Sequence, residues 1–299
     1  MILVSILLLF FSCSKYNMNI TDTDNTVKKI DFAQINIVIS NNSKMLAFAS
    51  WADFNNVVSV LAEQTNAHTQ NYLAPLIAQG LVDDDLTDKM TLDGFNSFQP
   101  LHAFNNTLSF ESYFQVAEQQ EILWLQNSEL NIATDPFKDV EVFQSALLNK
   151  DGEVMIGTEV FKAGEANSNS CSFWDGKSSW SSVYGFVGKN RLLKFWIGIS
   201  PGAAHSSTKA YYKKSNGNWA FWFTNEISSN IYGQKRSHLY NGECGDLDVD
   251  INPRASKIFG FYTFASNLDL NLTSAAIRDE YTVKSNHSAP NSGIISLNY

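Results

Sequence analysis

The stretch LLNKDGEVMIGTEVFK, residues 147–162, separates two halves of the chain that differ in their hydrophobic pattern. Before it, apolar residues recur at intervals of three and four, which is the spacing of a helix, and after it they alternate, which is the spacing of a strand. Within it, Asp151-Gly152 is a dipeptide typical of hairpin turns, and Val154, Ile156 and Val160 favour strands. We therefore predict a β-hairpin where a helical half meets a β half.

The composition indicates a folded, acidic protein with a sizeable core. Of 299 residues, 44% are hydrophobic and 17% are charged, a balance typical of globular proteins and not of disordered chains. The formal net charge is −9, and no cluster of basic residues rises above that background. A nucleic-acid partner is therefore not expected, because such partners require a basic surface.

The N-terminus has the features of an export signal. Residues 2–11 (ILVSILLLFF) form a ten-residue apolar run, which is too short for a membrane-spanning helix and suits the apolar part of a signal peptide. The run ends at Ser12-Cys13, which resembles the lipobox of bacterial lipoproteins, where the cysteine becomes the first mature residue and carries the lipid. The resemblance implies lipidation of Cys13 and attachment to the cell envelope, at the periplasmic or the surface face of the outer membrane. The alternative is a cleaved secretory signal.

The segment after the signal and the remaining cysteines fit an exported protein. Residues 14–30 are polar and without periodicity, as expected for a tether. Two cysteines remain, Cys171 and Cys244, both in the β half. An even pair in an oxidising compartment is compatible with a disulfide, and the alternative of two free thiols stays open. No spacing of cysteine and histidine indicates a zinc site.

The first half of the chain predicts short strands followed by helices. Residues 35–40 and 45–50 read as two strands around an Asn-Asn-Ser turn, and Ser50 is placed to cap a helix over 51–64. A second helix is predicted over 72–81, with Pro75 in its first turn. The remaining predicted helices cover 109–126, which has its apolar stripe at Tyr113, Val116, Ala117, Gln120, Leu123 and Trp124, and 137–148 after Asp135-Pro136.

The second half predicts many short strands separated by turn residues, which is typical of an antiparallel sandwich. The predicted strands are 182–187, 192–199, 208–214, 219–223, 227–232, 246–251, 257–264 and 275–283. The predicted fold class is α+β, with a mostly helical N-terminal part packed against a C-terminal antiparallel β-sandwich. The predicted boundaries are 1–13 for the signal and lipobox, 14–30 for the tether, 31–150 for the helical domain and 151–299 for the β domain.

The order of these elements resembles a family of uncharacterised lipoproteins of the Bacteroidetes. The shared features are a strand running into a helix (MLAFASWADFNNVVSVL), Asp135-Pro136, the hairpin motif over 147–162, and a pattern over 191–233 that contains Trp196, the run HSSTKAYYKK and Trp219. The family is a domain of unknown function. The resemblance therefore implies a location in the envelope and a fold, but no catalytic residues.

No motif in the sequence codes for a known chemistry. Residues 198–202 (GISPG) match the GxSxG pattern of hydrolases, but Pro201 has no N–H to donate to an oxyanion. Asp246, Asp248 and Asp250 alternate along a predicted strand, which favours a solvated strand face over a calcium loop. We therefore predict no catalytic residue, no metal and no cofactor.

The aromatic content of the β half gives the functional hypothesis. Trp174, Trp180, Trp196, Trp219 and Trp222 fall within about fifty residues. Successive side chains of a strand point to opposite faces, so the run WAFWF over 219–223 has rings on both. Either both faces are covered, or exposed rings bind a ligand.

Two functions are compatible with these features, and they predict different structures. The first is a non-catalytic lipoprotein that binds a glycan, a peptide or an envelope protein through its tryptophans, and it predicts exposed rings. The alternative is an envelope hydrolase acting on glycans or peptides, and it predicts a pocket at the junction of the two halves where carboxylates or a histidine and a carboxylate meet.

Overall fold

The computed structural model describes residues 35–40, 42–127, 130, 134–137, 140–163, 175–184, 190–200, 203–222, 224–240, 244–260, 262–267, 276–288 and 295–298. After residue 163, side chains are described at Lys194 and at residues 205–222. Helices occupy the first half and long antiparallel strands the second, so the α+β class is confirmed. No helix in these ranges is long and apolar enough to cross a bilayer.

The predicted hairpin exists, and it joins a sheet with the first two strands of the chain. β1 (Asn36–Ser40) and β2 (Ser43–Phe48) form one hairpin, while β3 (Glu153–Ile156) and β4 (Glu159–Lys162) form the other. β3 lies parallel to β2, which gives the order β1-β2-β3-β4. The hairpin at the boundary of the two halves therefore completes a sheet begun more than a hundred residues earlier.

The turn of this hairpin is not at the dipeptide that the sequence indicated. Ile156 pairs with Glu159, so the two-residue loop is Gly157-Thr158, and Gly157 has a φ of 61°. A positive φ at the first loop residue alone matches a type II′ turn, which favours glycine there. Asp151-Gly152 instead forms the turn that leads into β3, where the N–H of Gly152 donates to the carbonyl of Asn149.

The first two predicted helices are a single long helix, α1 (Trp51–Ala78). Ser50 caps it as predicted, because its side chain accepts from the N–H of Asp53. The polar segment that we took as a break remains helical, and its Thr65 and Thr69 are buried. Pro75 lies near the end of the helix and not in a first turn. α2 (Asp83–Asp93) and α3 (Gln99–Asn105) follow.

The predicted helix over 109–126 is α4 (Tyr113–Trp124), and its buried face differs from the prediction. Ser112 caps it in a capping box with Gln115. The buried residues are Phe114, Ala117, Glu121 and Trp124, whereas Leu123, which we placed in the apolar stripe, is 65% exposed. These buried residues are also spaced by three and four, but one of them is the carboxylate Glu121. A search for apolar residues alone therefore does not identify this face.

The helix predicted over 137–148 is largely absent. Among the described residues of this segment, which exclude 138 and 139, only α5 (Val142–Ser145) is helical. Asp135 uses its carboxylate to accept from the N–H of Phe137 in a local turn, and Glu141 caps α5 by accepting from the N–H groups of Phe143 and Gln144. Each acidic side chain thus satisfies backbone donors over a short segment, which favours turns over a continuous helix.

The second half forms two antiparallel sheets, with strands at most of the predicted places but longer. One sheet has the order β11-β7-β6-β5 with β8 paired to β7, and the other has the order β10-β9-β12-β13. The strands are β5 (Asp175–Tyr184), β6 (Asn190–Ser200), β7 (Ala203–Lys213), β8 (Trp219–Phe221), β9 (Thr224–Tyr240), β10 (Cys244–Gly260), β11 (Tyr262–Asn267), β12 (Ala276–Ser288) and β13 (Ile295–Asn298).

The strand predicted over 257–264 is divided between two strands of the structure. Its first part belongs to β10, which also contains the strand predicted over 246–251, and its last part belongs to β11. Within β10 the register against β9 shifts between Ile251 and Arg254, and Pro253 lies in that shift. A proline has no N–H for the ladder, so it fits a bulge without ending the strand.

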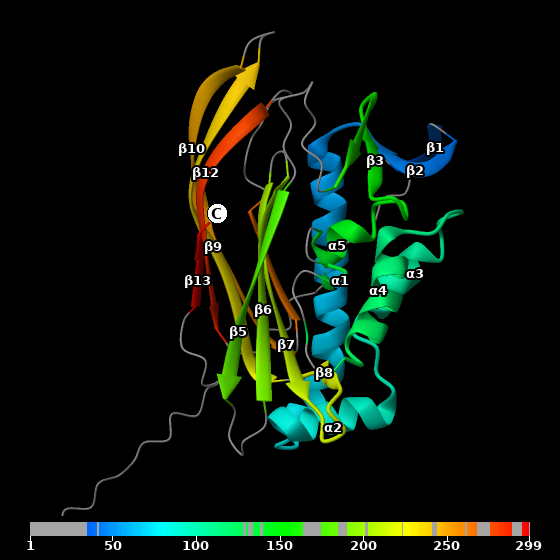
Figure 1. Cartoon of the computed structure of the whole chain (residues 1–299), viewed down its shortest axis with the longest axis vertical. Helices are drawn as coiled ribbons and strands as arrows, with labels where there is room; N and C mark the ends of the chain where they lie inside the picture. The colour runs from blue at the N-terminus through cyan, green and yellow to red at the C-terminus, as the bar shows by residue number, and fades with distance from the viewer. Residues whose placement is uncertain are drawn as a thin grey trace, which may run out of the picture.

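We call the sheet β11-β7-β6-β5 the β7 sheet and the sheet β10-β9-β12-β13 the β9 sheet. The helices, the β7 sheet and the β9 sheet lie in successive layers (Figure 1). The burial of β7 agrees with a middle position for its sheet. Every residue from His205 to Tyr211 is buried, and because successive side chains of a strand face opposite ways, both faces of β7 are covered. Tyr211 and Lys209 contact α4 on one side. The sandwich core itself stays a prediction, since it depends on strands whose side chains are not described.

Candidate functional site

Two lysines lie side by side in the middle layer, on the face that meets the helices. Lys194 of β6 pairs across the strands with Lys209 of β7. They are 4% and 3% exposed. Like charges opposite each other on a sheet repel, and burying an ammonium costs several kcal/mol unless a counter-charge is present. The helical half supplies that counter-charge with two buried carboxylates, Glu121 and Asp135. We refer to Lys194, Lys209, Glu121, Asp135 and Tyr211 as the lysine–acid cluster.

Lys209 contacts a carboxylate and several aromatic rings. Its Nζ lies 2.5 Å from Oε1 of Glu121, and the hydroxyl of Tyr211 donates to the same oxygen over 3.1 Å. Four aromatic rings surround the ammonium, with their centroids between 5.0 and 5.9 Å away, and a ring face attracts a cation. These rings belong to Phe98, Phe137, Tyr211 and Phe221.

Lys194 contacts a differently held carboxylate. Its Nζ forms an ion pair with Oδ2 of Asp135 and donates to the carbonyl of Phe137 over 3.1 Å. The other oxygen, Oδ1, accepts from the N–H of Phe137 over 2.9 Å. Burial lowers the pKa of Lys194 below its usual value, with Asp135 opposing this effect and the charge of Lys209 adding to it. Lys194 therefore holds its proton less firmly than an exposed lysine does.

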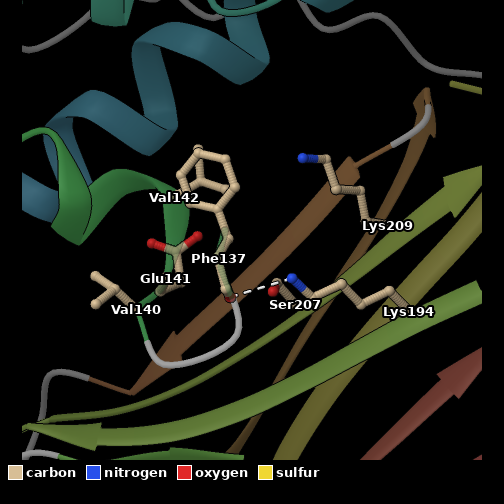
Figure 2. Close-up of a pocket in the computed structure, with 7 residues that line it drawn as sticks. All are labelled: Phe137, Val140, Glu141, Val142, Lys194, Ser207 and Lys209. Carbon is tan, nitrogen blue, oxygen red and sulfur yellow. Dashed lines mark hydrogen bonds between the residues drawn. The ribbon is translucent and has the colours of Figure 1, made fainter. Parts of the chain in front are cut away.

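A cavity of about 10 Å³ adjoins both lysines, and that volume holds about one water molecule. Lys194, Ser207 and Lys209 line it from the strands (Figure 2). The segment of the helical half that contains Phe137, Val140, Glu141 and Val142 lines the rest. A substrate does not fit in this space.

A third ionisable pair lies nearer the surface, between α3 and α4. His102 of α3 and Glu118 of α4 are 3.0 Å apart, and their side chains are 31% and 26% exposed. Burial raises the pKa of Glu118, although His102 opposes the shift. Glu118 is one turn before Glu121, so the pair borders the lysine–acid cluster. Its groups have the types used in general acid–base catalysis.

Of the five tryptophans predicted to bind a ligand, the two whose side chains are described, Trp219 and Trp222, are both packed against the molecule. Trp222 is 4% exposed, so its ring is not displayed to a ligand. Trp219 is half-buried. Its backbone N–H donates to the carbonyl of Leu125 over 2.8 Å, and the ammonium of Lys213 lies 5.7 Å from the centroid of its ring. Ile122 and Leu123, at the same end of α4, are 58% and 65% exposed.

The structure does not describe the side chains of the other predicted site residues. Cys13, Cys171 and Trp174 lie outside the described residues, and the side chains of Trp180, Trp196 and Cys244 are not described. Lipidation, the disulfide and ligand binding by the five tryptophans therefore stay predictions. In the described part of the chain, no group of three or more acidic, histidine or cysteine side chains is arranged to hold a metal ion.

The lysine–acid cluster was not predicted from the sequence, although signals for it exist. Lys194 interrupts the apolar run LLKFWIGI, and Glu121 has apolar Ala117 and Trp124 at helical spacing on either side. A charged residue at an apolar position of an element indicates a buried partner. The sequence does not reveal the partner of Glu121, because that partner, Lys209, lies 88 positions further along the chain.

Comparisons with known proteins leave the chain without an assigned function. No protein-family model matches it, and no curated protein matches it. Among solved structures, it is similar to a DUF4848 family protein from Bacteroides thetaiotaomicron. That likeness has 13% identity and a TM-score of 0.20 and covers 88% of this chain and 100% of the other. At this TM-score we infer neither fold nor activity from it.

Proposed function

We propose that this chain is an exported lipoprotein, held to the cell envelope through Cys13, that binds a glycan or an envelope protein without catalysing a reaction. The apolar run before Ser12-Cys13 and the polar tether after it support the anchor. The β half, proposed as a sandwich of the two large sheets, carries the binding surface. The half-buried Trp219, whose backbone N–H donates to Leu125 just after the exposed Ile122 and Leu123, is the observation that supports binding most directly.

The anchor is tested by changing Cys13 to Ser in the full chain. A thioether-linked lipid requires the cysteine sulfur, so we expect Cys13→Ser to abolish incorporation of labelled fatty acid and to move the protein from the membrane fraction to the soluble one. Cys244→Ser is the matched control, and it should leave labelling unchanged. Equal labelling of Cys13→Ser and the unchanged chain would disprove lipidation at Cys13.

Binding at Trp219 is supported by how its ring is held. The β7–β8 pairing and the hydrogen bond to Leu125 fix the backbone, while Lys213 lies against the ring. A ring that is already oriented loses little conformational freedom when a ligand stacks on it. Sugars and apolar side chains both use such contacts, and the exposed Ile122 and Leu123 enlarge the apolar area at this end of α4.

The binding proposal is tested by titrating the full chain with polysaccharides and peptidoglycan fragments while following tryptophan fluorescence and melting temperature. We expect saturable binding that Trp219→Ala weakens by a factor of about 5 to 150, since stacking on one aromatic ring contributes about 1–3 kcal/mol for nucleic-acid bases. Trp222→Phe replaces a buried ring and should leave affinity unchanged. If no glycan binds, crosslinking in intact envelopes decides for or against a protein partner near Trp219.

A hydrolase is the second candidate, and the His102–Glu118 pair is the observation that favours it. The pair lies where the helical half meets the β7 sheet, is partly exposed, and includes a carboxyl whose pKa is raised by burial. A carboxyl of this kind suits a general acid. The cavity beside the neighbouring cluster holds only about one water molecule, which is why we rank this candidate second.

A further inference from the structure

We propose that Lys194 and Asp135 become joined by an amide bond, a covalent link between strand β6 and the segment that precedes α5. The two side chains are in direct contact, are 5% and 0% exposed, and belong to the two layers that the lysine–acid cluster joins. This modification is independent of the binding function proposed above.

The reaction balances without any other reactant. Nζ of Lys194 attacks Cγ of Asp135, the new C–N bond forms, and the bond from Cγ to Oδ2 breaks. Of the three protons on the ammonium, one stays on the amide nitrogen and two leave with Oδ2 as water. The ion pair therefore converts into a neutral amide and one water molecule, with no oxidation, no reduction and no net exchange of protons.

The hydrogen bonds around the pair favour this step. The N–H of Phe137 donates to Oδ1 of Asp135, which is the oxygen that carries negative charge in the tetrahedral intermediate. The carbonyl of Phe137 accepts from Nζ, which directs the nitrogen toward the carboxyl group. Burial also lowers the pKa of Lys194, which favours the neutral amine that acts as the nucleophile.

The surroundings favour the product as well as the reaction. A buried ion pair retains the desolvation cost of two ions, and a neutral amide lacks that cost. Two groups held in contact also react with effective concentrations of about 10⁵–10⁸ M, far above those in solution. The adjoining cavity has room for about one water molecule, which is the quantity that the reaction releases.

The neighbouring pair is a built-in comparison. Lys209 lies among four aromatic rings that stabilise its cation, and the oxygen of Glu121 that it contacts also accepts from Tyr211. A ring face attracts an ammonium group, and a hydroxyl that donates to a carboxylate stabilises the carboxylate. We therefore expect the Lys209–Glu121 pair to stay ionic in the same protein.

Peptide mass spectrometry of the full chain, denatured and digested with trypsin, tests the proposal. Trypsin does not cleave after a lysine whose nitrogen is in an amide. We therefore expect a branched product that joins residues 90–138 to residues 192–209, lighter than the two peptides together by one water molecule. Fragmentation should place the branch at Asp135 and Lys194. Complete cleavage after Lys194, giving the linear peptides 192–194 and 195–209, would overturn the proposal.

Three variants separate an amide from an ion pair. Lys194→Arg keeps the charge but removes the amine, so the branched peptide should disappear. Asp135→Asn should still give the branched product, with the same mass as before, because ammonia leaves instead of water. Lys209→Arg should leave the branch intact. A branch that survives Lys194→Arg would contradict the assignment. The unchanged chain decides the question even if a variant does not fold.

Discussion

At the scale of single residues, the charged side chains of the lysine–acid cluster are buried, where charge is costly. Lys209 and Glu121 are each 3% exposed, and each has the other as its counter-ion. An ion pair buried in this way adds little stability compared with apolar residues of the same size, but the loss of one partner is costly. Its effect is to specify which face of α4 meets β7, since any other rotation of the helix would leave Lys209 without a carboxylate.

This asymmetry gives a prediction about single and double variants. Lys209→Met leaves the Glu121 carboxylate buried without its cation, so we expect the free energy of unfolding to fall by about 3–5 kcal/mol. The double variant Lys209→Met with Glu121→Leu removes both charges and should recover most of that loss. Urea unfolding, followed by tryptophan fluorescence, measures both.

The control for this prediction is an ion pair of equal length on the surface. Lys89 and Asp93 of α2 are also 2.5 Å apart, but their side chains are 38% and 32% exposed. Lys89→Met should change stability only slightly, because water screens the charges. The interpretation of the buried pair is wrong if the double variant is no more stable than Lys209→Met alone.

At the scale of elements, local signals predicted what exists but not always where it begins. The hairpin was predicted because Val154, Ile156 and Val160 are strand formers, and this holds. The position of its turn was missed because Asp151-Gly152 and Gly157 both suit turns, and tertiary contacts decide between them. Asn149 provides those contacts, since its side chain donates to Ser43 and to the carbonyl of Lys44 of β2.

The same limit explains the errors in the helices and in the site. Nothing in the polar segment after Gln64 breaks a helix, and only packing shows that α1 continues to Ala78. In α4, the sequence favours a mostly apolar stripe that contains Leu123, but the buried face includes Glu121 because Lys209 faces it. Propensity and periodicity are local, whereas a buried charge is explained by a partner far along the chain.

At the scale of the whole molecule, strand β7 lies between the helices and the sheet that contains β9, and its side chains are buried on both faces. The buried run from His205 to Tyr211 contains a histidine that is 0% exposed. Burial lowers the pKa of His205 from 6.5 to about 3, because the charged imidazolium would lose its hydration. The folded protein therefore keeps His205 neutral at pH values where the unfolded chain protonates it.

This difference makes the layered packing sensitive to acid. The folded pKa of His205 is depressed, so its contribution to stability is complete above pH 6.5 and is lost as the pH falls toward 3. We expect the free energy of unfolding to fall by about 2 kcal/mol between pH 7.5 and pH 5 through this residue, at about 1.4 kcal/mol per pH unit below 6.5.

His205→Leu does not titrate and should lack that part of the fall, whatever its stability at pH 7.5. His68→Leu, which removes a partly exposed ring, is the matched control and should retain it. Urea unfolding of the three proteins at both pH values measures the difference, and an equal fall in the unchanged chain and in His205→Leu would show that His205 becomes protonated without opening the fold.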